Sequence, residues 1–144
     1  MFSDTHFHFK QMVESCGFSG SEELNKMAEN NVFFAMDIGT KSNDLKERLE
    51  CVAKAISSIE SEENRLKAER FIYFSAGIWP SPEEIKNRHE AVKILEENIN
   101  LALKSENPLF RKISAIGECG LDHHWNPSGV DGRALSDFDT DMLL

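Results

Sequence analysis

Two histidines near the start of the chain, His6 and His8, are spaced so that they could bind one metal ion. They lie in an aromatic-rich stretch, residues 2–9, which predicts a β-strand because it is too short for a helix and β-branched at Thr5. Alternate side chains of a strand share a face, so Asp4, His6 and His8 should point together, about 6–7 Å apart. Imidazole suits Zn, Fe, Ni or Cu. An HxH pair alone is weak evidence, because both rings could equally be hydrogen-bonded inside a sheet.

A carboxylate, Glu118, is the third residue that could bind a metal. It ends an apolar strand predicted over residues 113–118, between Gly117 and Gly120. Sites in parallel α/β folds form at the carboxyl ends of strands, and glycines let an ion approach the backbone closely. Carboxylate suits Mg or Mn, so a mixed set leaves the metal open. We therefore expect His6, His8 and Glu118 to face one site.

An alternation of strands and helices should position these residues. We predict strands over 2–9, 32–38, 71–78 and 113–118, and helices over 21–31, 42–70 and 81–107. The segments 10–20 and 119–144 are expected to be loops. This order is typical of a parallel sheet with crossover helices, and both an open sheet and a barrel fit it.

Two of the predicted helices carry further local information. The apolar stripe of residues 42–70 should be buried, with the other faces charged and solvated. Ser81, Pro82 and Glu84 form a helix start, because they supply an N-cap, a proline in the first turn and a carboxylate at the third helical position.

Composition restricts the class of protein. The 144 residues are 40% hydrophobic and 28% charged, with three widely spaced cysteines that we interpret as reduced thiols. No run approaches the roughly 20 apolar residues that cross a bilayer, so we expect a cytoplasmic protein without a membrane partner. The net charge of −9 is the wrong sign for wholesale phosphate neutralisation, and any nucleic-acid contact must be local.

Three segments together resemble a known family. Asp-Thr-His-Phe-His-Phe at 4–9, Gly-Ile-Trp-Pro at 77–80 and Gly-Glu-Cys-Gly-Leu-Asp at 117–122 look like successive signatures of TatD-type deoxyribonucleases. These are metal-dependent hydrolases of the amidohydrolase-like barrel type, and the resemblance covers nearly the whole chain. It implies an α/β fold of parallel (β/α) units forming about half of a TIM-type barrel.

The resemblance also implies a domain organisation. Residues 1–144 would be the N-terminal half of a TatD-like barrel domain, since a complete barrel takes about 250 residues. A half barrel leaves two unpaired strand edges and an open interior. We therefore expect a fragment, a truncated reading frame, or a chain that self-associates or needs a second barrel half.

The implied activity is hydrolysis of phosphodiester bonds, as in a TatD-like DNase of the 3′–5′ exonuclease type. His6, His8 and Glu118 would hold divalent metal ions. By analogy with the family there would be two ions, and Mg, Mn and Zn all remain open. The substrate would be DNA or another phosphodiester. The family's general-base aspartate would lie beyond Leu144, so no catalytic residue is identified and little or no activity is expected of this chain alone.

Departures from the family pattern leave several residues with two interpretations. Trp79 stands where the family usually has His; it could stack on a base or plug the barrel mouth. Asp122 could line the substrate side of the pocket or bond to loop amides. His123 and His124 could complete a metal site or simply pack in the loop.

Two other functions remain open for the whole chain. One is a non-catalytic metal-binding or interaction fragment, suggested by the missing ligands from later strands. The other is a PHP-type phosphoesterase, since that class likewise opens with HxH. The Gly-Glu-Cys-Gly-Leu-Asp segment favours the TatD-like hypothesis over the PHP-type one.

Overall fold

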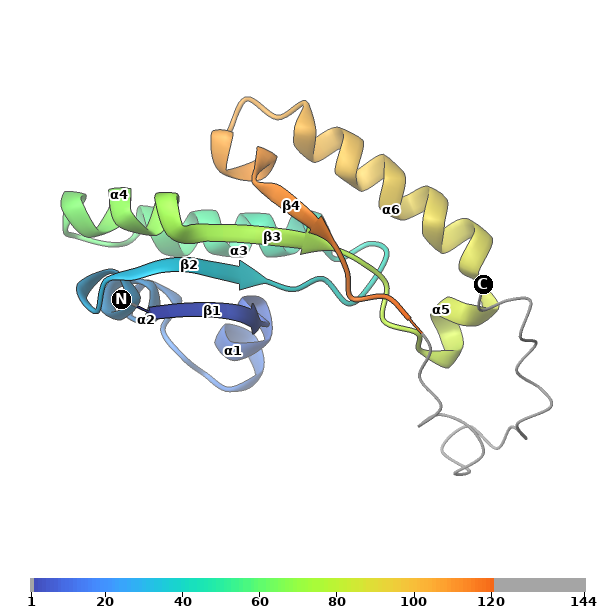
Figure 1. Ribbon diagram of the computed structural model, residues 1–144, viewed down its shortest axis with the longest axis horizontal. Coiled ribbons are helices and arrows are strands. Elements are labelled where there is room, and N and C mark those ends of the chain that lie inside the picture. Colours follow the sequence, from blue (N-terminus) through green and yellow to red (C-terminus); the bar gives the residue numbers. More distant parts are fainter. Residues whose placement is uncertain (1, 121–144) are drawn as a thin grey trace.

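The computed structural model describes residues 2–120, and their centre is a parallel sheet of four strands in the order β1-β2-β3-β4 (Figure 1). Each neighbouring pair is parallel, so all four carboxyl ends lie at one edge. The α/β class and the sequential strand order are those predicted, and they fit part of a TIM-type barrel. The strands are β1 (Phe2–Phe7), β2 (Val32–Asp37), β3 (Ile72–Ala76) and β4 (Ile113–Ile116).

Six α-helices and one 3-10 helix connect the strands within these residues. They are α1 (Phe9–Ser15), α2 (Gly20–Glu29), α3 (Leu45–Ser57), α4 (Glu62–Phe71), α5 (Pro82–Lys86), α6 (Arg88–Leu103) and the 3-10 helix η1 (Pro108–Arg111). The helix start at Ser81 is confirmed, because its hydroxyl accepts a hydrogen bond from the Glu84 N–H at 3.3 Å. Between residues 2 and 120, no helix has the length and apolar character that crossing a membrane requires.

The segment 10–20, predicted as a loop, contains helix α1. Phe9, Met12 and Val13 pack toward the core from it, and Phe9 is only 1% exposed. Their spacing of three and four residues was a readable helical signal. The helix was missed because it is short and directly follows a strand.

The predicted helix over 42–70 is two helices, α3 and α4. The Ser58 hydroxyl bonds back to the Lys54 carbonyl, as serine does where it competes with helical hydrogen bonding. Ser61 then caps α4 by accepting from the Asn64 N–H. Ile59 lies between the two helices and is nevertheless buried. The helical spacing of apolar residues therefore continues across the break, which concealed the break in the sequence. The prediction over 81–107 likewise divides, at Asn87, into α5 and α6.

The two faces of the sheet differ in what covers them. Ala35, Ile72 and Phe74 are buried against helices that surround one face. On the other face, the rings of Phe34 and Tyr73 stack at 5.2 Å and are only half-buried. The nearly continuous apolar runs 32–38 and 71–78 predict that both faces of the sheet are covered, and within the described residues this holds for one face. A sheet of four strands does not close on itself, so its inner face stays open.

Candidate metal centre

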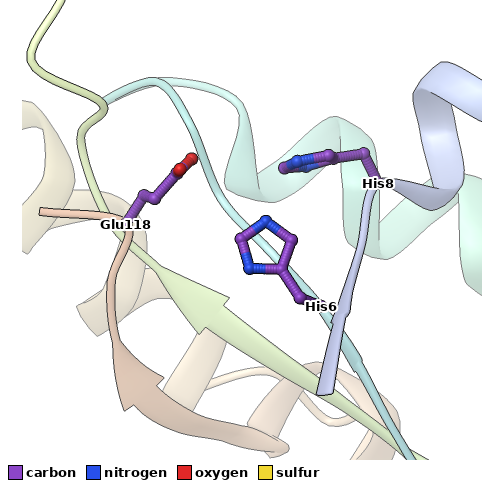
Figure 2. Close-up of side chains that lie close together, drawn as sticks. All are labelled: His6, His8 and Glu118. Carbon is purple, nitrogen blue, oxygen red and sulfur yellow. The ribbon is translucent and has the colours of Figure 1, made fainter. Parts of the chain in front are cut away.

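His6, His8 and Glu118 lie together at the carboxyl edge of the sheet (Figure 2). One potential ligand atom of each residue lies within 4.8 Å of those of the other two. The two imidazole rings meet edge to face, with centroids 5.2 Å apart. His6 belongs to β1, His8 follows it directly, and Glu118 follows β4. The sheet therefore brings together residues more than a hundred positions apart, as the sequence indicated.

The three residues suit a divalent metal in donor type and spacing. Two nitrogens and a carboxylate form a donor set that zinc sites use, at bond lengths of about 2.0–2.2 Å. Two donors of one ion can then be at most about 4.4 Å apart, so a spread of up to 4.8 Å lies slightly above that limit. Small side-chain rotations would bring all three atoms to one ion.

The ring of His8 is oriented by the main chain of the neighbouring strand. Its Nδ1 lies 3.1 Å from the carbonyl oxygen of Ile38. A carbonyl only accepts, so Nδ1 carries the hydrogen and Nε2 keeps its lone pair. Metal-binding histidines usually donate their second ring nitrogen in this way, which fixes both tautomer and direction.

Glu118 is placed by its main chain rather than by its side chain. Its N–H donates to the Gly39 carbonyl at 3.2 Å, and the preceding Gly117 N–H donates to Ala76 at 2.9 Å. A Cβ added at Gly77 would lie 2.0 Å from the carbonyl carbon of Gly117. Only glycine allows this close approach of two backbones, so Gly77 is part of the reason that Glu118 reaches the site.

Asp4 has a structural role. Its Oδ1 accepts the main-chain N–H of His6 at 3.0 Å. The pairing of β1 with β2 shifts register between Asp4 and Phe7, so simple alternation does not hold there. From the sequence, a carboxylate two residues before His6 suggests a structural role or the orientation of a metal-bound imidazole, which such rings usually require. The observed contact supports the main chain of His6 instead of its ring.

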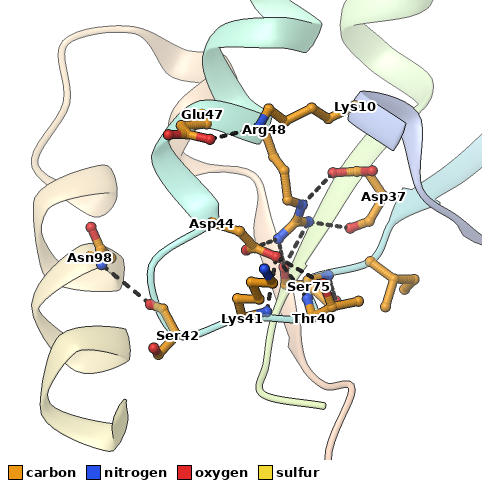
Figure 3. Close-up of polar contacts among 12 residues, drawn as sticks. Lys10, Asp37, Thr40, Lys41, Ser42, Asp44, Glu47, Arg48, Ser75 and Asn98 are labelled. Atoms are coloured by element: carbon orange, nitrogen blue, oxygen red, sulfur yellow. Dashed lines mark hydrogen bonds and ion pairs between the residues drawn. The ribbon is translucent and has the colours of Figure 1, made fainter. Parts of the chain in front are cut away.

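A buried ionic cluster beside the metal centre was missed in the sequence (Figure 3). Arg48 is 4% exposed and Asp37 is 1% exposed, and Arg48 Nε donates to Asp37 Oδ2 at 2.8 Å. The prediction that the charged residues of this helix are solvated is therefore wrong at Arg48. Burial raises the pKa of the Asp37 carboxyl, while the Arg48 guanidinium and the Phe9 N–H act in the opposite direction.

The remaining candidates are less fully placed. Trp79 is half-buried and lies three residues after β3. Its main-chain N–H donates to the Thr40 carbonyl at 2.9 Å. Cys119 is exposed beside Glu118. Asp122, and with it the histidine pair that follows, lies outside the described residues.

Comparison with protein families decides the relationship of the chain. A family model described as "TatD related DNase" matches residues 3–135. The chain belongs to this family. TatD-related proteins are hydrolases of nuclease type and are generally metal-dependent, and membership decides against the PHP-type hypothesis. Comparison with curated proteins and with solved structures finds no match.

Proposed function

We propose that this TatD-related chain contributes to metal-dependent hydrolysis of phosphodiester bonds in DNA, with His6, His8 and Glu118 as metal ligands. The observation that carries the proposal is the meeting of these three donors within 4.8 Å at the carboxyl edge of the sheet. Parallel α/β enzymes build their sites at this edge. A pure interaction role would not require the donors to converge, whereas a non-catalytic metal-binding role would, and measurement of cleavage separates that role from catalysis.

The chemistry of the donor set suits phosphodiester cleavage. Divalent ions lower the pKa of water and neutralise charge on phosphoryl oxygens. In the neutral His8 imidazole, Nε2 keeps its lone pair for an ion because the Ile38 carbonyl accepts the hydrogen on Nδ1. Glu118 adds negative charge, which favours a cation over an anionic group. Positive charge for the substrate would then come from the ions, which reconciles DNA as substrate with a net charge of −9.

Trp79 is our candidate for contact with the substrate. It follows β3 at the same edge as the metal centre, and its main chain is fixed by Thr40. Stacking of a base on an aromatic ring contributes about 1–3 kcal/mol and tolerates any sequence. We propose that Trp79 stacks on an unpaired base next to the scissile phosphate. Asp122 stays a further candidate on the substrate side.

Metal content measured by elemental analysis tests the proposal first. We expect the purified chain to bind Mn²⁺ or Zn²⁺ stoichiometrically, and His6→Ala/His8→Ala to lose it. Glu118→Gln should bind more weakly because it removes the carboxylate charge. His89→Ala is the matched control, since His89 is an exposed histidine on α6. Unchanged metal content in the double variant would sink the assignment of the ligands.

Cleavage of a labelled single-stranded oligonucleotide tests the reaction separately. Three donors are few for a pair of ions, so further donors are expected from outside residues 2–120. We expect weak cleavage by the chain alone, dependent on added metal and absent in Glu118→Gln. Metal binding without any cleavage, under every metal tested, would instead identify a non-catalytic metal-binding module.

A further inference from the structure

We infer that Arg48 is a positioning residue for the metal centre, acting through the tripeptide Asp37-Ile38-Gly39. The inference rests on the proposed role of His8 and Glu118 as ligands. It concerns a guanidinium whose hydrogen bonds go to Asp37, Asp44 and Ser75 and not to either ligand (Figure 3). The tripeptide holds both ligands, and Arg48 holds the tripeptide.

Each residue of the tripeptide supports the metal centre by one hydrogen bond. Asp37 Oδ1 accepts the N–H of Phe9 at 2.8 Å, which fixes the main chain next to His8. The Ile38 carbonyl accepts from the His8 ring at 3.1 Å. The Gly39 carbonyl accepts the Glu118 N–H at 3.2 Å. A shift of these three residues would therefore move both ligands together.

Arg48 donates five hydrogen bonds, two of them to Asp37 of the tripeptide and three to Ser75 and Asp44 beside it. Nε donates to the Asp37 carboxylate at 2.8 Å and Nη2 to the Asp37 carbonyl at 2.8 Å. Nη1 and Nη2 both donate to the Ser75 carbonyl on β3 at 3.1 Å, and Nη1 donates to Asp44 at 3.0 Å. A guanidinium has five N–H donors in a fixed planar arrangement, and here every one has an acceptor. Arg48 thus links β2, β3 and the start of α3.

Ser75 completes the arrangement from the neighbouring strand. Its hydroxyl accepts the Gly39 N–H at 3.1 Å, so the tripeptide is held at both ends. Ser75 is 1% exposed, so its hydrogen bond with Gly39 is buried. Buried polar groups without water have no alternative partner, so each lost bond must be met by movement of the backbone. Lysine could not replace Arg48 fully, because its ammonium cannot bridge several acceptors in one plane.

This arrangement assigns Arg48 an effect on metal affinity beyond its effect on folding. Removing groups that orient metal ligands typically lowers affinity 10- to 100-fold. Without Arg48, the Ile38 carbonyl would no longer hold the His8 ring in the tautomer that leaves Nε2 free. A residue important only for folding would change stability and leave the affinity of the folded protein unchanged.

Titration of Co²⁺ into the full chain, followed by its visible absorption bands, tests the inference. The variants are Arg48→Met, Arg48→Lys and Ser75→Ala, each measured where circular dichroism shows a folded protein. Ser75→Ala removes the acceptor of the Gly39 N–H and keeps the main-chain carbonyl that Arg48 contacts, so it tests the tripeptide separately, and Arg48→Lys tests the Arg48 contacts if Arg48→Met fails to fold. Ile56→Ala is the matched control, because it destabilises the same helix, α3, away from the site.

We expect Arg48→Met and Ser75→Ala to raise the Kd for Co²⁺ about tenfold or more and to shift the absorption bands. Arg48→Lys should lie between them and wild type, whereas Ile56→Ala should keep the wild-type Kd and spectrum. Wild-type Kd and spectrum in both Arg48→Met and Ser75→Ala would overturn the inference. Absence of Co²⁺ binding in the wild type would overturn the ligand assignment and this inference with it, whereas binding without DNA cleavage would overturn only the proposed reaction.

Discussion

Two cations, Arg48 and Lys112, hold backbone carbonyls at opposite ends of the sheet, and they do so in different ways. Arg48, at the carboxyl edge, is almost fully buried and has a carboxylate partner in Asp37. Lys112 precedes β4 at the other end, donates to the carbonyls of Glu69 and Arg70, and lies 4.1 Å from the centre of the Tyr73 ring. No ion pair to Lys112 is found among residues 2–120.

The difference appears in how each charge is accommodated. Burial lowers the pKa of Lys112 to about 8, and the nearby Glu69 carboxylate acts in the opposite direction. Arg48 cannot release its proton at ordinary pH, so its burial requires a complete set of acceptors. The edge with the candidate metal centre is thus held by a guanidinium that stays charged, and the opposite edge by an amine that can lose its proton.

The largest expected effect is that of Arg48→Met. It leaves the Asp37 carboxylate buried without its partner, which typically costs about 3–5 kcal/mol of folding free energy. Urea denaturation followed by circular dichroism measures the change. Replacing both partners, as Arg48→Met/Asp37→Leu, should recover much of the stability because no charge stays buried. If Arg48→Met alone were as stable as wild type, burial of Arg48 would not require its acceptors, and the two ends of the sheet would not differ in this respect.

Gly77→Ala should have the next largest effect and lower the free energy of unfolding by about 3 kcal/mol. The new Cβ would lie 2.0 Å from Gly117 and 2.3 Å from the Glu118 nitrogen, and these are backbone atoms that cannot rotate away. Thermal unfolding measures the loss. Gly20→Ala is the control, since its closest neighbour, at 2.9 Å, is the ring tip of Phe9 and alanine favours the helix there. Equal effects at both glycines would show that the metal-centre edge is no more tightly packed than α2.

The smallest effect concerns Lys112 and depends on pH. Because its folded pKa is lowered to about 8, the unfolded chain binds more protons between about pH 8 and the ordinary value of 10.5. The free energy of unfolding should therefore rise with pH in this window, by about 1 kcal/mol at most after screening by solvent. Lys112→Met should lose this rise while retaining the rest of the pH profile. A rise that persists in the variant would assign it to another group.

The convergence of the three candidate metal ligands could be predicted from the sequence because the carboxyl ends of strands carry them. Parallel strands place their carboxyl ends together, so His8 after β1 and Glu118 after β4 had to share an edge. The helix start at Ser81 was equally readable, because capping is local chemistry. These features depend on neighbours within a few residues or on strand direction alone.

Features that depend on tertiary partners were missed. Arg48 lies within the apolar stripe of α3, three residues after Leu45 and four before Val52, and Asp37 is the one charge in an apolar strand. Each was a visible irregularity, but nothing in the sequence pairs two residues eleven positions apart on different elements. The break between α3 and α4 was hidden for a similar reason, because Ile59 lies in neither helix and is buried by tertiary packing.

The tripeptide Asp37-Ile38-Gly39 has a consequence for how the chain can change in length. Successive residues of an extended backbone point in opposite directions. An inserted residue would therefore turn the carbonyls of Ile38 and Gly39 away from His8 and Glu118. The connection over residues 58–61 contacts neither ligand, and lengthening such a connection costs only about 0.6 kcal/mol per doubling. Insertions and deletions should therefore be tolerated between α3 and α4 and excluded from the three residues after Met36.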